Sequence, residues 1–534
     1  MHKISILWLG LVLAGVQVFA AGAETVPADV IARVHYAGTA RISADRNSAS
    51  VANFFASPEA KALEAQTLEK LSRAPGIWYR NKIAPGGGDG VAQLRPLLDD
   101  FLTSEWLFEI REAPGGTLEY TLAIRLDAAR AALWQNNLMS LLQSWTGVPA
   151  QKIPNGWQLR KHVTPNLFRT TRAGDWVVIG CGDNVLPQMD ALFGRLAARQ
   201  PLVGPEETGW VEANLNWPRL ARWFPVLQKF DFPAVAVQIA GGEGYLHVSG
   251  KFTLTQALPV LEKWRVPNVI HPPLTSFTAV RGIGPWLARQ SWAQPFEIQP
   301  PPDEFFIWAM PENAYQLYAA APVTDANNAL AQLNAKLSAY FSAGSKNVFM
   351  GQITTELKNN EISWRGIPPF MSPYVRALYE PSGEYLFGGF FPNAPRPQPL
   401  PRELTGQLSM PNLVYYHWEL TGQQLNNLPR VTQLLLLLTQ HRQLEGTSAA
   451  EKWLTRIRPA LGQSATQVTQ TAPNELTFVR SASAGLTAFE LIALADWLEA
   501  PNFPGCDLRL PPRQPRLGRP VAHPAAVPAA PAKK

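Results

Sequence analysis

The sequence predicts an α+β fold of two related halves, each an antiparallel sheet with helices packed on one face, followed by a disordered Pro-rich C-terminal tail. Three observations point to this fold: apolar and polar residues alternate in paired segments, a capped helix follows most pairs, and the order of these units repeats. The 534 residues are 46% hydrophobic and include 24 Phe, 18 Trp and 12 Tyr. This content excludes disorder throughout, and the length suggests roughly two to four domains.

The first element is a leader at residues 1–23 that has the features of a signal peptide. A short basic start with Lys3 precedes an apolar run from Ile4 to Phe19, and Ala21-Gly22-Ala23 matches an A-x-A cleavage site. We therefore expect export to the periplasm or the cell surface and removal of the leader. The alternative is an uncleaved N-terminal anchor, although the run is short for a transmembrane helix.

The clearest local structure spans residues 105–147. Trp106–Glu112 and Thr117–Leu126 are predicted strands joined by a Pro-Gly-Gly turn, and the second alternates apolar and polar residues at five successive steps. Asp127 is then expected to cap a helix that ends at Gly147.

The same strand–strand pattern recurs four times, and each pair is expected to lead into a helix. These helices are expected to begin at caps Asp183 and Asp325, at Thr487 with capping-box spacing to Glu490, and over Thr255–Trp264. The paired strands are Leu167–Arg172 with Trp176–Gly180, Ala234–Ala240 with Tyr245–Phe252, Glu304–Ala309 with Tyr315–Ala320, and Gln467–Thr471 with Leu476–Arg480.

The repeats are ordered as two halves. Phe108 matches Phe306 and Asp127 matches Asp325 at one offset of 198 positions, and further collinear matches follow. We therefore expect a first half at residues 24–270 and a second at 275–500, separated at His271-Pro-Pro-Leu274, with a helical insertion near 431–461. The alternative is a general strand–helix rhythm without common ancestry.

The tail at residues 505–534 holds most of the net charge of +6. It has six basic residues against one acid, together with seven prolines, whereas residues 24–504 are neutral. Such a segment is expected to be disordered and to contact anionic envelope material, or else to act only as a solubilising extension. The candidate anion contacts are Arg509, Arg513, Arg516 and Arg519. A neutral body without clustered Lys and Arg argues against a nucleic-acid partner.

A search for catalytic motifs in the sequence is negative. It contains no Ser nucleophile elbow, no His-Glu-x-x-His and no Cys-x-x-Cys, so we expect no cofactor and no metal. His35, His247 and His417 are interpreted as structural residues of strands. The Gly-rich stretch 86–90 opens no predicted helix and is interpreted as a loop. Residues 480–485 are interpreted as a helix-capping segment rather than an anion-binding nest.

Two cysteines and a group of tryptophans complete the candidates. A Cys181–Cys506 disulfide is one alternative, and a buried Cys181 with a free Cys506 is the other. Exposed indoles stack on sugars or apolar ligands, whereas buried ones fill space. The candidate binding residues, which cluster in the sequence around the predicted junction of the halves, are Trp217, Trp223, Trp286, Trp292 and Trp308.

With its leader, its repeated units and the ending TAPNELTFVRSASAGLTAFELIALADWLEAP (471–501), the chain resembles a family of exported bacterial proteins of unknown function. The resemblance spans most of residues 25–505, implies a periplasmic or surface location, and carries no catalytic residues. The sequence favours a non-enzymatic envelope protein that acts as a scaffold or ligand-binding module. The alternatives are a hydrolase acting on a sugar or lipid, and a subunit of an envelope complex.

Overall fold

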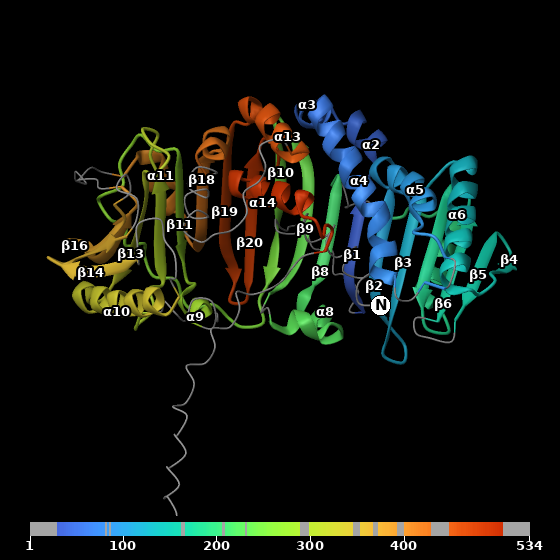
Figure 1. Cartoon of the computed structure of the whole chain (residues 1–534), viewed down its shortest axis with the longest axis horizontal. Helices are drawn as coiled ribbons and strands as arrows, with labels where there is room; N and C mark the ends of the chain where they lie inside the picture. Colours follow the sequence, from blue (N-terminus) through green and yellow to red (C-terminus); the bar gives the residue numbers. More distant parts are fainter. Residues whose placement is uncertain are drawn as a thin grey trace, which may run out of the picture.

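The computed structural model describes residues 29–80, 83–84, 87–161, 166–204, 209–229, 232–288, 298–344, 353–366, 372–391, 400–428 and 448–505. Within these residues, twenty strands form one continuous sheet in which every neighbouring pair is antiparallel. Figure 1 shows the strands side by side, from β14 and β16 at one end to β4 at the other.

Across the sheet the strands are β4 (Gln151–Ile153), β5 (Gly156–Arg160), β6 (Leu167–Ala173), β7 (Trp176–Gly182), β3 (Thr117–Arg125), β2 (Trp106–Ala113), β1 (Val30–Tyr36), β8 (Val211–Asn216), β9 (Ala234–Gly242), β10 (Tyr245–Thr253), β20 (Glu475–Ala482), β19 (Gln463–Ala472), β18 (Leu413–Leu420), β11 (Ser276–Arg281), β12 (Glu304–Ala309), β13 (Leu317–Val323), β17 (Gly383–Gly389), β16 (Tyr374–Glu380), β15 (Glu361–Arg365) and β14 (Thr354–Lys358).

The α-helices are α2 (Thr39–Ala44), α3 (Ala49–Phe55), α4 (Pro58–Tyr79), α5 (Val91–Thr103), α6 (Ala128–Thr146), α7 (Pro187–Ala197), α8 (Trp217–Trp223), α9 (Gly284–Leu287), α10 (Ala326–Gly344), α11 (Arg402–Leu408), α13 (Ala449–Ile457) and α14 (Ala488–Glu499). Short 3-10 turns are η1 (Arg46–Ser48), η3 (Pro225–Lys229) and η5 (Arg458–Ala460). None of the helices in the described ranges is both long and apolar enough to span a membrane.

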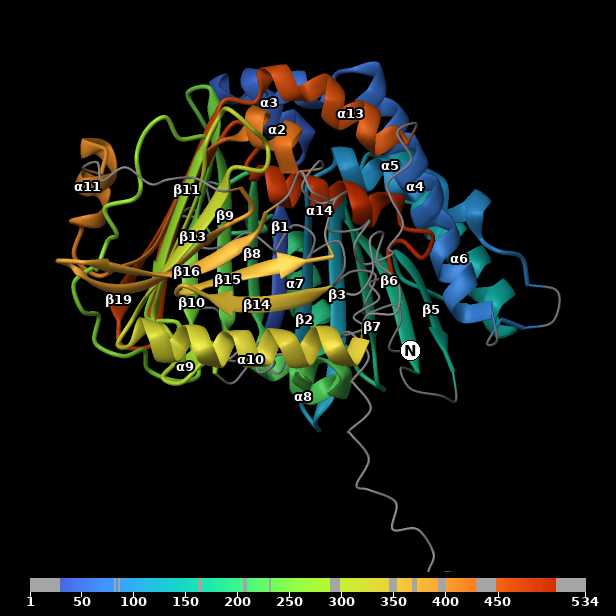
Figure 2. The same ribbon diagram turned by 60° about the vertical axis from the view of Figure 1, so that its left-hand side comes forward.

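Successive residues of a strand point to opposite sides of the sheet. We call the side that carries α14, which faces the viewer in Figure 1, the front, and the other side the back. Phe478 of β20 faces the front, where α14 lies, and Val479 faces the back. Figure 2 shows α3, α4, α5, α13 and α14 on the front side and α11 on the back. The front core beside β1 and β20 contains Val34, Val248 and Phe478.

The expectation that helices pack on one face only is wrong. In β2, Phe108 packs with Trp134 of α6 on the front, whereas the adjacent Leu107 packs with Met189 of α7 on the back. The back core of β12 and β13 packs against Leu404 of α11. Near its ends, this sheet has apolar side chains on both sides. Both sides therefore need helices to cover them.

The predicted strands are confirmed, and several helix starts are confirmed with their caps. The Asp127 carboxylate accepts the Arg130 backbone N–H at 2.8 Å, Asp325 accepts that of Asn328 at 2.9 Å, and Thr487 with Glu490 forms a full capping box. Arg480, the first residue of the 480–485 segment, donates to the Glu490 carboxylate of that capping box, which agrees with the capping interpretation of the segment.

Three local expectations are wrong. Residues 255–264 form no helix, because Pro259 lacks an N–H and the Leu258 N–H donates to the Pro473 carbonyl instead. Asp183 caps no helix, because α7 begins at Pro187. Gly90 directly precedes α5, so the Gly-rich stretch does lead into a helix.

Carboxylates that are distant in sequence hold the first turns of several helices. Glu119 of β3 accepts the Met189 N–H of α7 at 2.8 Å, and Glu384 of β17 accepts the Ala326 N–H of α10 at 2.7 Å. Glu419 of β18 accepts the Ala488 N–H of α14 at 2.7 Å. A helix N-terminus has unpaired N–H groups and a partial positive charge, so these contacts fix where each helix lies on the sheet.

Candidate functional site

The middle of the sheet has one side that the described helices leave largely uncovered; α11 reaches only its border, where Gln467 Nε2 donates to Gln407 Oε1 at 2.6 Å. This side lies on the back of β9, β10, β20 and β19, between α7 toward one end and α11 toward the other. We call this surface the open face. Its residues are Ala236, Gln238 and Ala240 of β9, His247, Ser249 and Lys251 of β10, Thr477, Val479 and Ser481 of β20, and Ala465, Gln467 and Thr469 of β19.

The strand registers place these side chains in three rows. The middle row runs Gln238, Ser249, Val479, Gln467, and each neighbour is directly opposite the next. With about 4.8 Å between strands and about 3.4 Å per residue, four strands and three rows cover about 14 Å by 14 Å. The surface is therefore large enough to hold part of an extended polymer.

Burial alternates in β10 and around Phe478 of β20, as a half-covered sheet requires, whereas in β9 only Val237 is buried. Every residue of the open face is partly exposed, and the intervening Val237, Val248 and Phe478 are buried. Val479 is 39% exposed in the middle row. Small and neutral polar side chains dominate, so the surface is suited to hydrogen bonding rather than to the packing of an apolar layer.

The charged side chains on and beside the open face, Lys251, Glu475 and Glu212, all have hydrogen-bonding partners. Lys251 Nζ lies 2.5 Å from Glu475 Oε2, and this hydrogen bond, with a second one from Thr471, lowers the pKa of Glu475. Glu212 of β8 accepts the Gly209 backbone N–H at 2.8 Å and the Gln238 amide at 3.3 Å. In contrast, His247, Ser249 and Ser481 make no side-chain hydrogen bond with any described residue.

A second polar cluster lies on the front of β11, β18 and β19. Thr278 Oγ1 is 2.8 Å from His417 Nδ1, and His417 Nε2 is 3.4 Å from Glu419 Oε2. A hydroxyl, an imidazole and a carboxylate in series resemble an activated nucleophile. However, Thr278 lies in mid-strand, where backbone N–H groups are used by the ladder and do not form an oxyanion hole.

The role of Glu419 indicates that this second cluster is structural, because its carboxylate accepts the Ala488 N–H in the first turn of α14. Its burial raises the carboxyl pKa, but hydrogen bonds and charge from His417 and the Ala488 N–H outweigh burial, so the pKa is lowered. The carboxylate therefore stays charged and holds the first turn of α14. His35 is likewise structural: it is fully buried in β1 and lies 3.3 Å from Glu105.

A cavity of about 490 Å³ lies between the end of α4 and the Gly-rich segment before α5. Arg73 and Arg80 line it, but so does Asp89, and Arg73 is already paired with Glu69. The negative end of the α4 dipole also points there, so the cavity is a poor anion site. Among the described residues, no group of three or more His, Cys, Asp and Glu is placed to hold a metal.

The three candidate tryptophans whose side chains the structure describes do not form one surface. Trp217 and Trp308 are 4% and 1% exposed and belong to different cores, on the front and the back of the sheet. Trp223 is partly buried against the same front core as Trp217. Trp286 belongs to α9, with its side chain outside the described part, and Trp292 lies outside the described residues. Large aromatics at core positions of strands and short helices pack inward.

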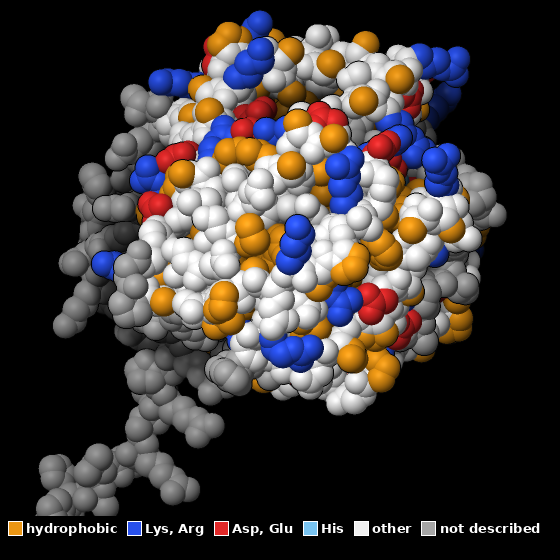
Figure 3. Space-filling model, turned by 90° about the vertical axis from the view of Figure 1, so that its right-hand side faces the viewer, with side chains coloured by type: hydrophobic (Ala, Val, Ile, Leu, Met, Phe, Trp, Pro, Cys, Tyr) orange, Lys and Arg blue, Asp and Glu red, His pale blue; other side chains and the backbone are white. Residues whose placement is uncertain are grey.

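The tail residues Arg509, Arg513, Arg516 and Arg519 lie outside the described residues, as do the leader and Cys506. Burial raises the pKa of the Cys181 thiol, in β7, to about 12. Figure 3 shows the end of the molecule that carries α6 and β4, where Lys and Arg are interspersed with Asp, Glu and apolar side chains. This end therefore presents no continuous basic surface.

Sequence reasoning missed the open face because its residues belong to no motif. The available signal was the alternation in β10, where His247, Ser249 and Lys251 alternate with Leu246, Val248 and Gly250. That alternation predicts a strand with one solvent-exposed side. It does not predict that four such strands are neighbours in the sheet. The chain matches no known protein-family model, no curated protein and no solved structure.

Proposed function

We propose that the protein is an exported, non-enzymatic binding protein that presents the open face to material of the cell envelope. The observation that carries this proposal is the largely uncovered polar surface across β9, β10, β20 and β19, in a sheet whose two ends are covered on the same side. Antiparallel sheets commonly pack one side against a core and leave the other side in contact with solvent. A solvated polar side is accessible to a ligand. The continuous sheet of twenty described strands supports the scaffold part of the proposal.

The placement of carboxylates favours binding over hydrolysis at this surface. Hydrolysis of a glycosidic bond by paired acids needs two carboxyl groups roughly 5–10 Å apart. Glu212 in β8 and Glu475 in β20 are carboxylates on strands that flank or form the open face, and β9 and β10 lie between their strands. Three strand spacings separate them by about 14 Å or more.

We also propose that the chain consists of two related halves. The first ten strands lie in the order β4, β5, β6, β7, β3, β2, β1, β8, β9, β10, and the second ten repeat that order with each number raised by ten. The two sets join through β10 and β20, the tenth strand of each. Superposition of the two sets in an experimental structure tests this, and different strand paths would contradict it.

The leader and the tail complete the proposal. Cleavage after residue 23 would deliver the protein to the periplasm or the cell surface, and the +5 tail would add salt-dependent attraction to anionic envelope material. This attraction needs no defined pocket, because flexible cations sum their long-range interactions.

The experiment is co-sedimentation with insoluble envelope polymer from the source cells, using a chain that ends at residue 504 so that the tail does not contribute. Ser249→Trp fills the middle row of the open face. Thr354→Trp is the matched control, because Thr354 is an exposed strand residue of β14 at the far edge of the sheet. We expect Ser249→Trp to lose binding and Thr354→Trp to keep it. Equal binding by both variants would overturn the proposal.

A further inference from the structure

Two aromatic side chains lie along one edge of the open face, at the end marked by the row of His247, Ser481 and Ala465. Tyr245 begins β10 on the same side as His247 and is 38% exposed. Trp418 of β18 is directly opposite Ala465 and is partly exposed, and its Nε1 donates to Gln463 Oε1 at 3.2 Å. Three strand spacings and one row separate the two residues, or about 16 Å.

The surface between these aromatics offers hydrogen-bonding groups that no described residue uses. His247 and Ser481 are directly opposite each other, and Ser249 is the next residue on the same side of β10. An imidazole and two hydroxyls both donate and accept, so they match a ligand that is rich in hydroxyl groups. An extended polypeptide would instead seek unpaired backbone groups at a strand edge, and these four strands have neighbours on both sides.

The charge balance of the surface indicates an uncharged ligand. Lys251 is paired with Glu475, so no Lys or Arg of the open face is left unpaired, and Glu212 beside the face accepts the neutral Gly209 N–H and keeps its negative charge. An anionic polymer would need unpaired Arg or Lys to compensate its desolvation. A second copy of this chain would be expected to bury an apolar centre, and Val479 is the one large apolar side chain among the twelve residues of the open face.

We propose that the open face binds an uncharged glycan that lies across the strands from Tyr245 to Trp418, with its hydroxyl groups hydrogen-bonded to His247, Ser249 and Ser481. Aromatic faces pack against the C–H faces of sugar rings, while the polar groups between them fix the ring orientation. The inference rests on the proposed function and adds the chemical class of the ligand.

The test is affinity electrophoresis of the chain ending at residue 504 in native gels that contain hydroxyethyl cellulose, a neutral glucan, or alginate, an anionic one. The variants are Tyr245→Ala, which removes one aromatic, and Val479→Asp, which places a charge in the middle row. The matched control is Tyr379→Ala, because Tyr379 of β16 is an exposed strand tyrosine at 50% and lies far from the open face. Circular dichroism checks that each variant is folded.

We expect the neutral glucan to retard the wild type and Tyr379→Ala equally, and both open-face variants to bind about tenfold more weakly. Failure of the neutral glucan to retard the wild type would overturn the glycan proposal. Retardation by alginate that Val479→Asp weakens would overturn it too, while leaving the open face as a binding surface. Retardation by the glucan that is unchanged in Tyr245→Ala and Val479→Asp would overturn the assignment of the site.

Discussion

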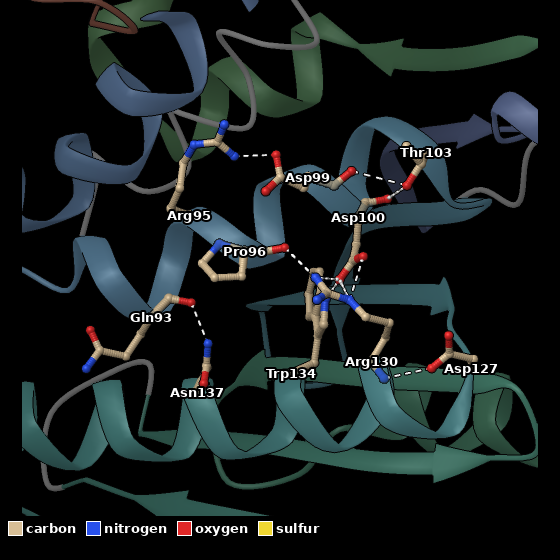
Figure 4. A network of polar contacts seen from close by, with 10 residues as sticks. All are labelled: Gln93, Arg95, Pro96, Asp99, Asp100, Thr103, Asp127, Arg130, Trp134 and Asn137. Atoms are coloured by element: carbon tan, nitrogen blue, oxygen red, sulfur yellow. Dashed lines mark hydrogen bonds and ion pairs between the residues drawn. The ribbon is translucent and has the colours of Figure 1, made fainter. Parts of the chain in front are cut away.

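Replacing Asp100 by Ala is expected to loosen the packing of α5 on α6. The Asp100 carboxylate accepts the Arg130 Nε–H and Nη2–H at 2.9 and 2.7 Å and the Trp134 Nε1–H at 2.7 Å, as Figure 4 shows. Arg130 Nη2 also donates to the Pro96 carbonyl at 2.7 Å. One carboxylate thus joins a charged and a neutral donor of α6 to helix α5.

The expected loss of stability depends on which hydrogen-bonding partners of Asp100 stay buried after the substitution. Trp134 is 3% exposed, so its N–H would lose its acceptor without gaining water, at a cost of about 1–3 kcal/mol. The Arg130 side chain is 37% exposed and can rehydrate, so its loss is well below the 3–5 kcal/mol of a fully buried pair. We expect about 2–4 kcal/mol for Asp100→Ala and a smaller loss for Asp100→Asn, which keeps an acceptor for Trp134.

The assay is native-state hydrogen exchange of the α5 and α6 amides, because a chain of this size does not guarantee two-state unfolding. The matched control is Asp99→Ala on the same helix. The Asp99 side chain is 54% exposed and pairs with Arg95, so its loss is expected below about 0.5 kcal/mol. A change of less than about 0.5 kcal/mol in the local opening free energy of Asp100→Ala would refute the reasoning.

Three further predictions concern the centre of the sheet and the tail. Because the pKa of Glu419 is below its ordinary value of 4.5, its contribution to stability is present above that pH and is lost on acidification; Glu419→Gln should lower the urea midpoint at pH 7 and flatten its decline toward pH 3, and an unchanged acid limb would contradict this. Phe478→Ala, at a site 1% exposed against Phe252, should cost about 3–5 kcal/mol in urea unfolding, and a loss near that of a surface residue would count against the core assignment. Deletion of residues 505–534 should remove the salt-dependent part of binding to anionic lipid vesicles, and equal binding by both chains at low and high salt would leave the tail without this role.

Hairpins and helix caps could be predicted because their determinants are local. Leu118, Tyr120 and Leu122 alternate with polar residues, and Asp127 lies where a cap must lie, so both appear directly in the sequence. No helix forms at Thr255–Trp264, although the repeat of strand–strand–helix units predicts one, because Pro259 has no backbone N–H. The cap of α7 could not be predicted, because Glu119 is distant in sequence and supplies it from β3.

The side of the sheet that each residue faces could not be read from the repeat. Phe108 pairs with Leu122 and Phe306 with Ala320, so the shift of 198 positions carries the hairpin register over. Yet Phe108 faces α6 on the front and Phe306 faces α11 on the back. A one-residue difference reverses every side chain of a strand, so equivalence in sequence does not fix the burial side. The open face was missed for the same reason, since it depends on which strands become neighbours.

Protection of a thiol introduced at position 479 tests most directly whether the open face is a binding surface. Val479→Cys and Ile307→Cys are compared in a chain with Cys506→Ser, because these two strand residues are 39% and 41% exposed and face the back and the front of the sheet. Cys181 contributes little background, because its pKa is raised to about 12 and few thiolates form. We expect a maleimide to label both cysteines in the free protein, and hydroxyethyl cellulose or envelope polymer to protect only the cysteine at position 479. Equal labelling of both positions with and without these polymers would contradict it.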